Sequence, residues 1–262
     1  MKFRIVFITL TLISSFAFAS GSSKLSDNDP KATHALKPKQ LNWEFDGFFG
    51  RFDRVSAQRG YQVYKEVCSA CHSLKRIAYR NLAEIGFSEN EIKQIASTYQ
   101  VTDGPDEEGD MFERPALPSD KFVNPYPNDN AARSANGGAL PPDLSLIIKA
   151  RPDGANYVYS LLNGYKEAPD GFEMTQGKYY NPYFEGRQIS MPQPITDDLH
   201  VEYKSTFASK EQMAIDVVNF LQWAAEPETE SRKKMGIRSI IFLIILFVIL
   251  IAAKKAVWKK IK

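Results

Sequence analysis

Cysteine and histidine are scarce in this sequence, which has two cysteines and three histidines among 262 residues. Two cysteines exclude a scaffold held by several disulfides. No segment repeats along the chain, and few stretches alternate between apolar and polar residues as half-buried strands do. A short hairpin within residues 170–190 is the only strand pair that we expect. The sequence therefore predicts a mainly α fold.

Acidic residues are absent from both ends of the chain. Of the 33 Lys and Arg residues, two lie in residues 1–19 and nine in residues 231–262, and neither segment contains Asp or Glu. Residues 20–230 keep 22 basic residues against all 31 acidic ones, a net charge of −9. A negative domain suits a basic soluble partner. It argues against nucleic acid as a partner, because nucleic acid attracts basic surfaces.

The N-terminal end has the pattern of a secretory signal. Residues 1–19 begin with two basic residues, continue with an apolar stretch and end in Ala17-Phe18-Ala19, a small-residue cleavage site. We expect this segment to be cleaved, so that residues 20–230 form one extracytoplasmic domain.

The C-terminal end has the pattern of a membrane anchor. Residues 236–253 are apolar apart from Arg238 and Ser239. They are long enough to span a bilayer when the flanking lysines extend to its surface. The basic tail, residues 254–262, is expected in the cytoplasm.

Both cysteines and one histidine occur in the run Cys68-Ser69-Ala70-Cys71-His72. This is the C-x-x-C-H spacing of c-type haem attachment. Two thiols at this spacing reach the two vinyl groups of one porphyrin, and the next imidazole ligates the iron. Haem attachment uses both thiols, so no intramolecular disulfide remains. The alternative is a thioredoxin-like C-x-x-C followed by an unrelated histidine.

The spacing leaves the second axial ligand open. Low-spin electron-transfer haems take Met or His at this position. Met191 lies between Ile189 and Ile195 in a loop whose prolines restrict the backbone and favour preorganised presentation of a sulfur. The competing residues are Met111, Met174, Met213, Met235, His34 and His200.

Capping signals and apolar periodicity predict the helices of the domain. Residues 101–142 are rich in Pro, Gly, Asp and Asn and are expected to form a long loop region. The expected helices start at Ser56 (with Tyr61, Tyr64 and Cys68 on one face), at Ser88, at Pro142, before Val158 and at Ser209.

Further runs accompany the haem motif over most of the chain. They are Arg59-Gly60-Tyr61-Gln62-Val63-Tyr64, Asp103-Gly104-Pro105, Met111-Phe112, Gly138-Ala139-Leu140-Pro141-Pro142-Asp143-Leu144-Ser145, Asn181-Pro182-Tyr183-Phe184, Met191-Pro192-Gln193-Pro194-Ile195 and Trp223-Ala224-Ala225-Glu226-Pro227-Glu228. With these runs the sequence resembles the cytochrome c1 family, the haem subunits of ubiquinol–cytochrome c reductase (complex III).

The resemblance implies a fold and a site. The fold is a cytochrome c-like single-haem domain with long loops, plus one C-terminal transmembrane helix. Cys68 and Cys71 would attach haem c covalently, His72 would be the proximal ligand and Met191 the distal ligand. Arg133 would contact a haem propionate. Some bacterial members have an extra disulfide, for which no cysteine is left here.

The resemblance also implies the function of an electron carrier without catalytic residues of its own. A Rieske iron–sulfur subunit would deliver electrons, a cytochrome c would accept them, and the anchor would pack beside cytochrome b. The short leader favours the bacterial inner membrane, with the haem domain in the periplasm, although the family also occurs in mitochondria.

Two other classes of function are kept as alternatives. A stand-alone membrane-anchored cytochrome c shuttle would need a longer linker than residues 227–234. A haem enzyme or sensor, such as a peroxidase, would need an open sixth coordination position.

Overall fold

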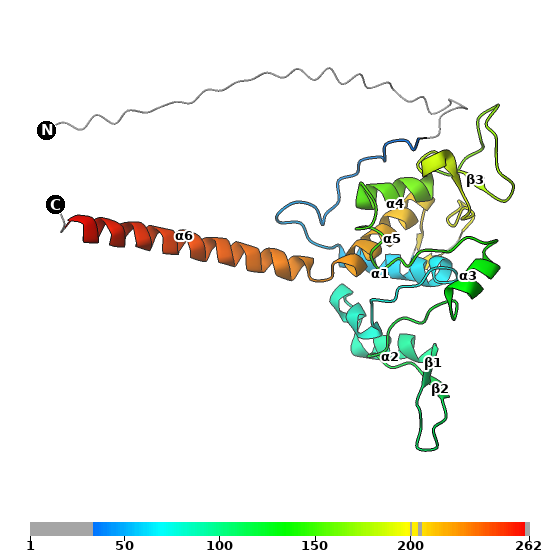
Figure 1. Cartoon of the computed structure of the whole chain (residues 1–262), viewed down its shortest axis with the longest axis horizontal. Coiled ribbons are helices and arrows are strands. Elements are labelled where there is room, and N and C mark those ends of the chain that lie inside the picture. Colours follow the sequence, from blue (N-terminus) through cyan, green and yellow to red (C-terminus); the bar gives the residue numbers. More distant parts are fainter. Residues whose placement is uncertain (1–33, 200, 204–205, 260–262) are drawn as a thin grey trace.

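The computed structural model describes residues 34–199, 201–203 and 206–259, so the expected signal peptide and His200 lie outside the described residues. Figure 1 shows a mainly helical domain from which one long helix projects. In chain order the elements are α1 (Arg54–Val63), η1 (Tyr64–Cys68), η2 (Tyr79–Ile85), α2 (Glu89–Ser97), β1 (Gln100–Asp103), β2 (Phe112–Pro115), α3 (Asp129–Ala135), α4 (Gly154–Asn163), β3 (Tyr179–Tyr180), η3 (Glu185–Arg187), β4 (Gln188–Ile189), β5 (Glu202–Tyr203), β6 (Thr206–Phe207), α5 (Lys210–Ala225) and α6 (Thr229–Lys259).

Helices α1 and α5 pack against each other at the centre of the domain, and α4 packs against α5. Gly60 of α1 makes the close approach possible, because a Cβ there would lie 1.9 Å from the backbone oxygen of Asp216. The buried Asp216 carboxylate accepts hydrogen bonds from Ser56 Oγ at 2.6 Å and from Arg59 at 2.8 Å through both Nε and Nη2. This buried network fixes the contact between the two helices.

Two of the predicted helix caps are confirmed. The side chains of Ser88 and Ser209 cap α2 and α5, as predicted, and α4 ends at Gly164. The predicted start of α1 at Ser56 is wrong: the Asp53 carboxylate caps α1 by accepting from the amides of Val55 and Ser56. The hydroxyl of Ser56 is instead used in the contact with α5.

The predicted long loop, residues 101–142, is wrong in part. It contains most of the antiparallel β1–β2 hairpin and all of α3, whose N-terminus is capped by Asn128. Arg114 of the hairpin forms ion pairs with Asp103 and Asp120. These polar contacts stabilise the hairpin. Its strands lack the alternation of apolar and polar residues by which strands are predicted from a sequence.

The helix predicted from Pro142 is absent from the described structure, where residues 144–150 form turns. The Asp143 carboxylate accepts hydrogen bonds from the amides of Ser145 and Lys75. Such side chain–backbone bonds compete with helix formation. The hairpin expected within residues 170–190 is confirmed as the β3–β4 pair.

Helix α6 carries the predicted anchor. It is the only helix among the described residues that is long and apolar enough to cross a membrane, and the domain does not cover its apolar stretch. The predicted span 236–253 lies inside it.

The junction between the domain and α6 is short and firmly tied. We call residues 226–233 the neck. Glu230 pairs with Arg54 at 3.0 Å, and Lys233 Nζ donates to the carbonyl oxygens of Phe45 at 2.8 Å and Gly50 at 3.2 Å. Burial raises the pKa of Glu230, but hydrogen bonds from Arg54 and a backbone amide outweigh it and leave that pKa below its ordinary value. The carboxylate is therefore charged at neutral pH.

Candidate functional site: a cavity beside the C-x-x-C-H segment

A cavity of about 820 Å³ opens beside the C-terminal end of η1. This volume is within the range of cofactor sites, about 300–1,000 Å³. Its wall is mainly apolar, and all four predicted site residues line it: Cys68, Cys71, His72 and Met191. Residues that lie more than 100 positions apart in the sequence therefore line the same cavity.

The chain reaches the cavity through a change in helix type. Helix α1 continues as one π-helical turn, η1, which ends at Cys68. Single π-helical turns occur frequently at functional sites. A tight turn follows, in which the amides of Cys71 and His72 donate to the Cys68 carbonyl at 3.1 and 2.8 Å. This turn places both cysteines and the histidine on the same wall of the cavity.

The His72 imidazole is held in one tautomer. Its Nδ1 lies 2.8 Å from the Pro142 carbonyl oxygen. Because that oxygen can only accept, Nδ1 carries the proton, and Nε2 keeps the lone pair that a metal requires. Burial lowers the pKa of His72, and the Pro142 carbonyl and the Asp143 charge offset this only in part. The ring is therefore neutral at physiological pH.

The loop that carries Pro142 is latched to the chain that follows His72. The Asp143 carboxylate accepts from Ser73 Oγ at 2.8 Å, from the Lys75 amide at 2.9 Å and from the Ser145 amide at 3.0 Å. Burial raises the pKa of Asp143, but these hydrogen bonds outweigh it and hold that pKa below its ordinary value. We call these contacts the Asp143 latch.

The environment of the cysteines differs from that of a redox-active C-x-x-C pair. Both cysteines are partly buried. Burial, with a smaller contribution from the charge of Cys71, raises the pKa of the Cys68 thiol to about 12. Thioredoxin-like cysteines have a lowered pKa because the thiolate is the reactive species. The raised pKa of Cys68 thus disfavours the thioredoxin-like interpretation.

Of the described methionines, only Met191 lines the cavity. Tyr165 holds its loop, donating from its hydroxyl to the Met191 carbonyl at 3.1 Å. The other candidates lie elsewhere. Met111, Met174 and Met235 are exposed, Met213 is buried in the core on α5, and His34 is exposed and contacts Glu185.

The structure places two arginines differently in relation to the cavity, and the resemblance had implied a role only for Arg133. Arg133 is exposed on α3 and donates to the Gly138 carbonyl at 3.2 Å; it does not line the cavity. Arg151, which sequence reasoning missed, lines the cavity and hydrogen-bonds Tyr157. An isolated arginine in a turn has no periodicity or spacing that would reveal this position.

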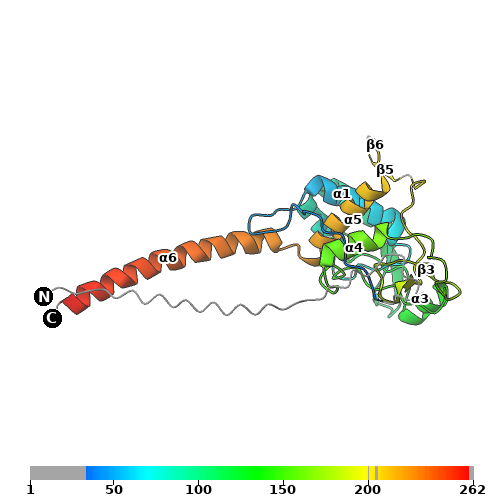
Figure 2. The same ribbon diagram turned by 90° about the horizontal axis from the view of Figure 1, so that it is seen from above.

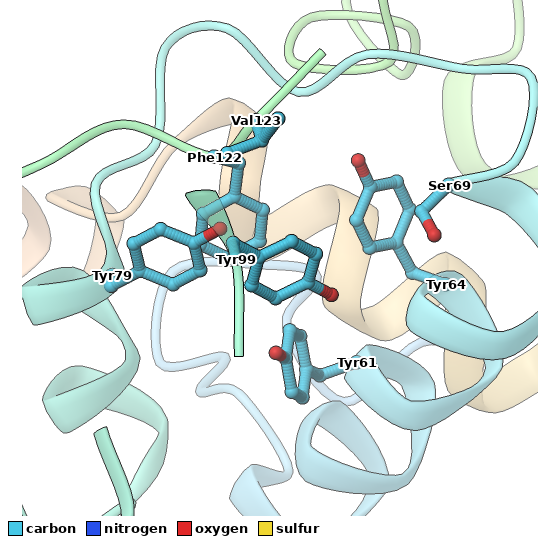
Figure 3. Close-up of a pocket in the computed structure, with 7 residues that line it drawn as sticks. All are labelled: Tyr61, Tyr64, Ser69, Tyr79, Tyr99, Phe122 and Val123. Atoms are coloured by element: carbon cyan, nitrogen blue, oxygen red, sulfur yellow. The ribbon is translucent and has the colours of Figure 1, made fainter. Parts of the chain in front are cut away.

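A cluster of tyrosines lies behind the motif and surrounds a small cavity of about 10 Å³, room for one water at most. Tyr79 stacks on Phe122 with ring centroids 4.7 Å apart, and the Tyr64 hydroxyl donates to the His72 carbonyl at 3.2 Å. The cluster thus supports the motif from the core side. Figure 3 shows its residues: Tyr61, Tyr64, Ser69, Tyr79, Tyr99, Phe122 and Val123.

The residues at the large cavity fit a covalently bound haem. A Met/His-ligated c-type haem needs two thiols at C-x-x-C spacing, one imidazole with a free Nε2 and one thioether sulfur. The cavity provides all of them. The apolar wall suits the porphyrin faces, and Arg151 offers a cation for an acidic substituent.

Comparisons with known proteins agree with this fit. The model of the cytochrome c1 family matches residues 43–261. Cytochrome c1 of Rhodospirillum rubrum is 48% identical over 237 residues, 84% of this chain and 87% of the relative. The "cytochrome b-c1 complex catalytic subunit, mitochondrial" of Candida albicans is 47% identical, over 92% of this chain and 84% of the relative. "Cytochrome b/c1" of Bradyrhizobium diazoefficiens is 42% identical, over 96% of this chain and 39% of the relative.

Proposed function

Because the chain belongs to the cytochrome c1 family, we propose that it is the membrane-anchored electron-transfer subunit of a quinol–cytochrome c oxidoreductase. In this role it takes electrons from a Rieske iron–sulfur protein and passes them to a cytochrome c. The observation that carries the proposal is the single cavity lined by Cys68, Cys71, His72 and Met191.

The four residues have distinct tasks in this proposal. Cys68 and Cys71 form the thioether bonds to haem c, and His72 and Met191 ligate its iron. A haem bound there supplies reversible one-electron chemistry. Arg151 is positioned on the cavity wall to pair with a propionate.

The surrounding residues orient the ligands and exclude water. The Pro142 carbonyl fixes the His72 ring, and the Asp143 latch fixes the Pro142 loop. Tyr165 fixes the backbone at Met191. The apolar wall keeps the site dry, and a dry site with a thioether ligand favours a high reduction potential.

The neck favours a subunit of a complex over a stand-alone shuttle. A shuttle needs a flexible linker, but here only residues 226–228 separate α5 from α6. Glu230 and Lys233 then tie α6 to the domain. The names of two relatives, which mention a b-c1 complex and cytochrome b, support cytochrome b as a partner.

In the proposed topology, α6 crosses a bacterial inner membrane once, after removal of residues 1–19. The domain then lies in the periplasm, and its net negative charge suits a basic cytochrome c.

A redox titration of the haem-loaded chain and its Met191→Leu variant tests the proposal. The parent is expected to show a high midpoint potential and no binding of carbon monoxide. Loss of the thioether should lower the potential by hundreds of millivolts, within the range of about 0.8 V that axial ligands control, and open the iron to carbon monoxide.

Met174→Leu is the matched control, because Met174 is exposed and does not line the cavity. An unchanged potential in Met191→Leu would exclude Met191 as ligand. Binding of carbon monoxide by the parent would instead favour a haem enzyme or sensor with an open sixth position.

A further inference from the structure

The segment before α1 forms a loop with an unusual distribution of aromatic side chains. We call residues 43–52 the aromatic loop. Trp43, Phe45 and Phe52 are buried on its flanks, whereas Phe48 is 52% exposed and Phe49 is 79% exposed at its tip. Loop tips in water are normally polar, so two adjacent exposed phenylalanines indicate a contact with something apolar.

The aromatic loop is closed by its own backbone. The Arg51 amide donates to the Glu44 carbonyl at 2.9 Å, and the Asp46 amide donates to the Trp43 carbonyl at 3.0 Å. Gly50 must be glycine, since a Cβ there would lie 2.0 Å from the Asp46 carbonyl oxygen. The stacked rings of Trp43 and Phe45, with centroids 5.4 Å apart, anchor the loop to the core. The structure thus holds the two exposed rings in place.

The aromatic loop lies beside the first turns of α6, on the side of the domain from which α6 leaves, as Figures 1 and 2 both show. Lys233 of α6 donates to two loop carbonyls, so the base of the loop is level with Lys233. The continuous apolar run of α6 starts at Ile240, seven residues or about 10 Å further along the axis. The headgroup layer of a bilayer is itself about 5–8 Å thick.

We propose that the tip of the aromatic loop inserts into the interfacial layer of the bilayer beside α6. The occupant of this surface is lipid, because the exposed rings adjoin the helix that carries the membrane-spanning stretch. Lys234 lies at the same level of α6, where basic side chains meet lipid phosphates, and Arg232 beside it pairs with Glu226 at 3.0 Å. The inference rests on the proposed anchoring of α6.

A second membrane contact has a clear physical effect. One transmembrane helix alone leaves a domain able to turn about the helix axis. Two contacts, α6 and Phe48–Phe49, fix which side of the domain faces away from the membrane. Aromatic rings suit this task, because the interface favours them energetically.

The test uses nitroxide labels on the haem-loaded full chain in nanodiscs of phosphatidylcholine and phosphatidylglycerol. Phe49→Cys places a label on the loop tip. Leu117→Cys is the matched control, because Leu117 is 51% exposed and comes two residues after the end of β2, a strand that lies away from α6 in Figure 1. Val248→Cys, in the apolar run of α6, reports whether the anchor is inserted.

Power-saturation electron paramagnetic resonance compares collisions of each label with oxygen, which concentrates in lipid, and with a water-soluble nickel chelate. The oxygen-to-nickel ratio at position 49 is expected to be several-fold higher than at position 117. Equal ratios at 49 and 117, with position 248 in lipid, would overturn the loop contact and leave the anchor intact. A water-exposed label at 248 would overturn both.

The same label in the assembled complex distinguishes lipid from a protein occupant. Contact with lipid predicts the same high ratio at position 49 in native membranes as in nanodiscs. A label at 49 that is immobilised and shielded from both reagents in the complex would show that another subunit covers the tip, and would overturn the assignment to lipid.

Discussion

Replacing Asp143 by Asn tests whether the latch beside the cavity positions His72. The substitution keeps the size of the side chain and removes its charge. The carboxylate accepts three hydrogen bonds, from Ser73 Oγ and from the amides of Lys75 and Ser145. An Asn side chain has one oxygen, so its NH₂ group must face at least one of these donors.

The expected loss in the free energy of unfolding follows from the replacement of an acceptor oxygen by an NH₂ group. One donor loses its partner, and the remaining hydrogen bonds lose the strength that a charged acceptor provides. We expect Asp143→Asn to destabilise the folded protein by about 2 kcal/mol, within the range of about 1–3 kcal/mol for such losses. For a domain of this size, that corresponds to a fall in Tm of about 4–8 °C.

Calorimetry of the haem-loaded chain measures the change, and a redox titration reports on His72. Because the latch holds the loop that supplies the Pro142 carbonyl, the midpoint potential of Asp143→Asn should also change. Glu107→Gln, an equivalent acid-to-amide change on an exposed hairpin loop, should leave both values unaltered. If Asp143→Asn matched the parent in both Tm and potential, the positioning role of the latch would be refuted.

Three further predictions concern helix packing, the neck and the cavity wall. Gly60→Ala places a Cβ against the Asp216 carbonyl and should cost about 1–3 kcal/mol by overpacking; chemical denaturation measures this, with Gly236→Ala, which meets no neighbour, as the control. Glu230→Gln should lower Tm by about 2–4 °C at pH 7, for a loss of about 1 kcal/mol. The lowered pKa of Glu230 means that its contribution is present above about pH 4.3 and is lost as the pH falls through the folded-state value, so the difference in Tm between variant and parent should shrink as calorimetry is taken to successively lower pH. Arg151→Gln removes a cation from the cavity wall and should lower the midpoint potential by tens of millivolts, the order expected for one charge at an effective dielectric constant of about 20; an unchanged potential would place the propionates elsewhere.

Local signals in the sequence predicted the elements that local interactions determine. Ser88 and Ser209 cap helices because a hydroxyl that precedes a helix satisfies free amides regardless of the rest of the fold. The spacing of Cys68, Cys71 and His72 indicated a haem site because its chemistry depends on consecutive residues. Ser56 was misassigned because the helix already begins after Asp53, which caps the amides of Val55 and Ser56, and because the Ser56 hydroxyl donates to a distant residue, Asp216.

Features that depend on distant contacts could not be predicted in this way. Arg151 lies on the cavity wall at the end of the turns that follow Asp143, a position that depends on the path of the chain through those turns. The β1–β2 hairpin is held by ion pairs of Arg114 and has no apolar alternation. Met191 was one of several candidates by spacing, and only the fold brings it to the cavity that His72 lines. Pairings between residues far apart leave no periodic trace in the sequence.

The π-helical turn η1 makes the orientation of the haem-attachment segment depend on the number of residues between the core and the cavity. Tyr61 and Tyr64 line the small tyrosine cavity, whereas Cys68, one turn later, lines the large one. A π-helical turn holds about one residue more than an α-helical turn, so the same residues in regular α-helical geometry would rotate the attachment segment by about 100° about the helix axis and point the thiols away from the cavity. One residue inserted within Tyr64–Cys68 would cause a rotation of the same order. This stretch should therefore tolerate substitutions on its exposed side more readily than an insertion.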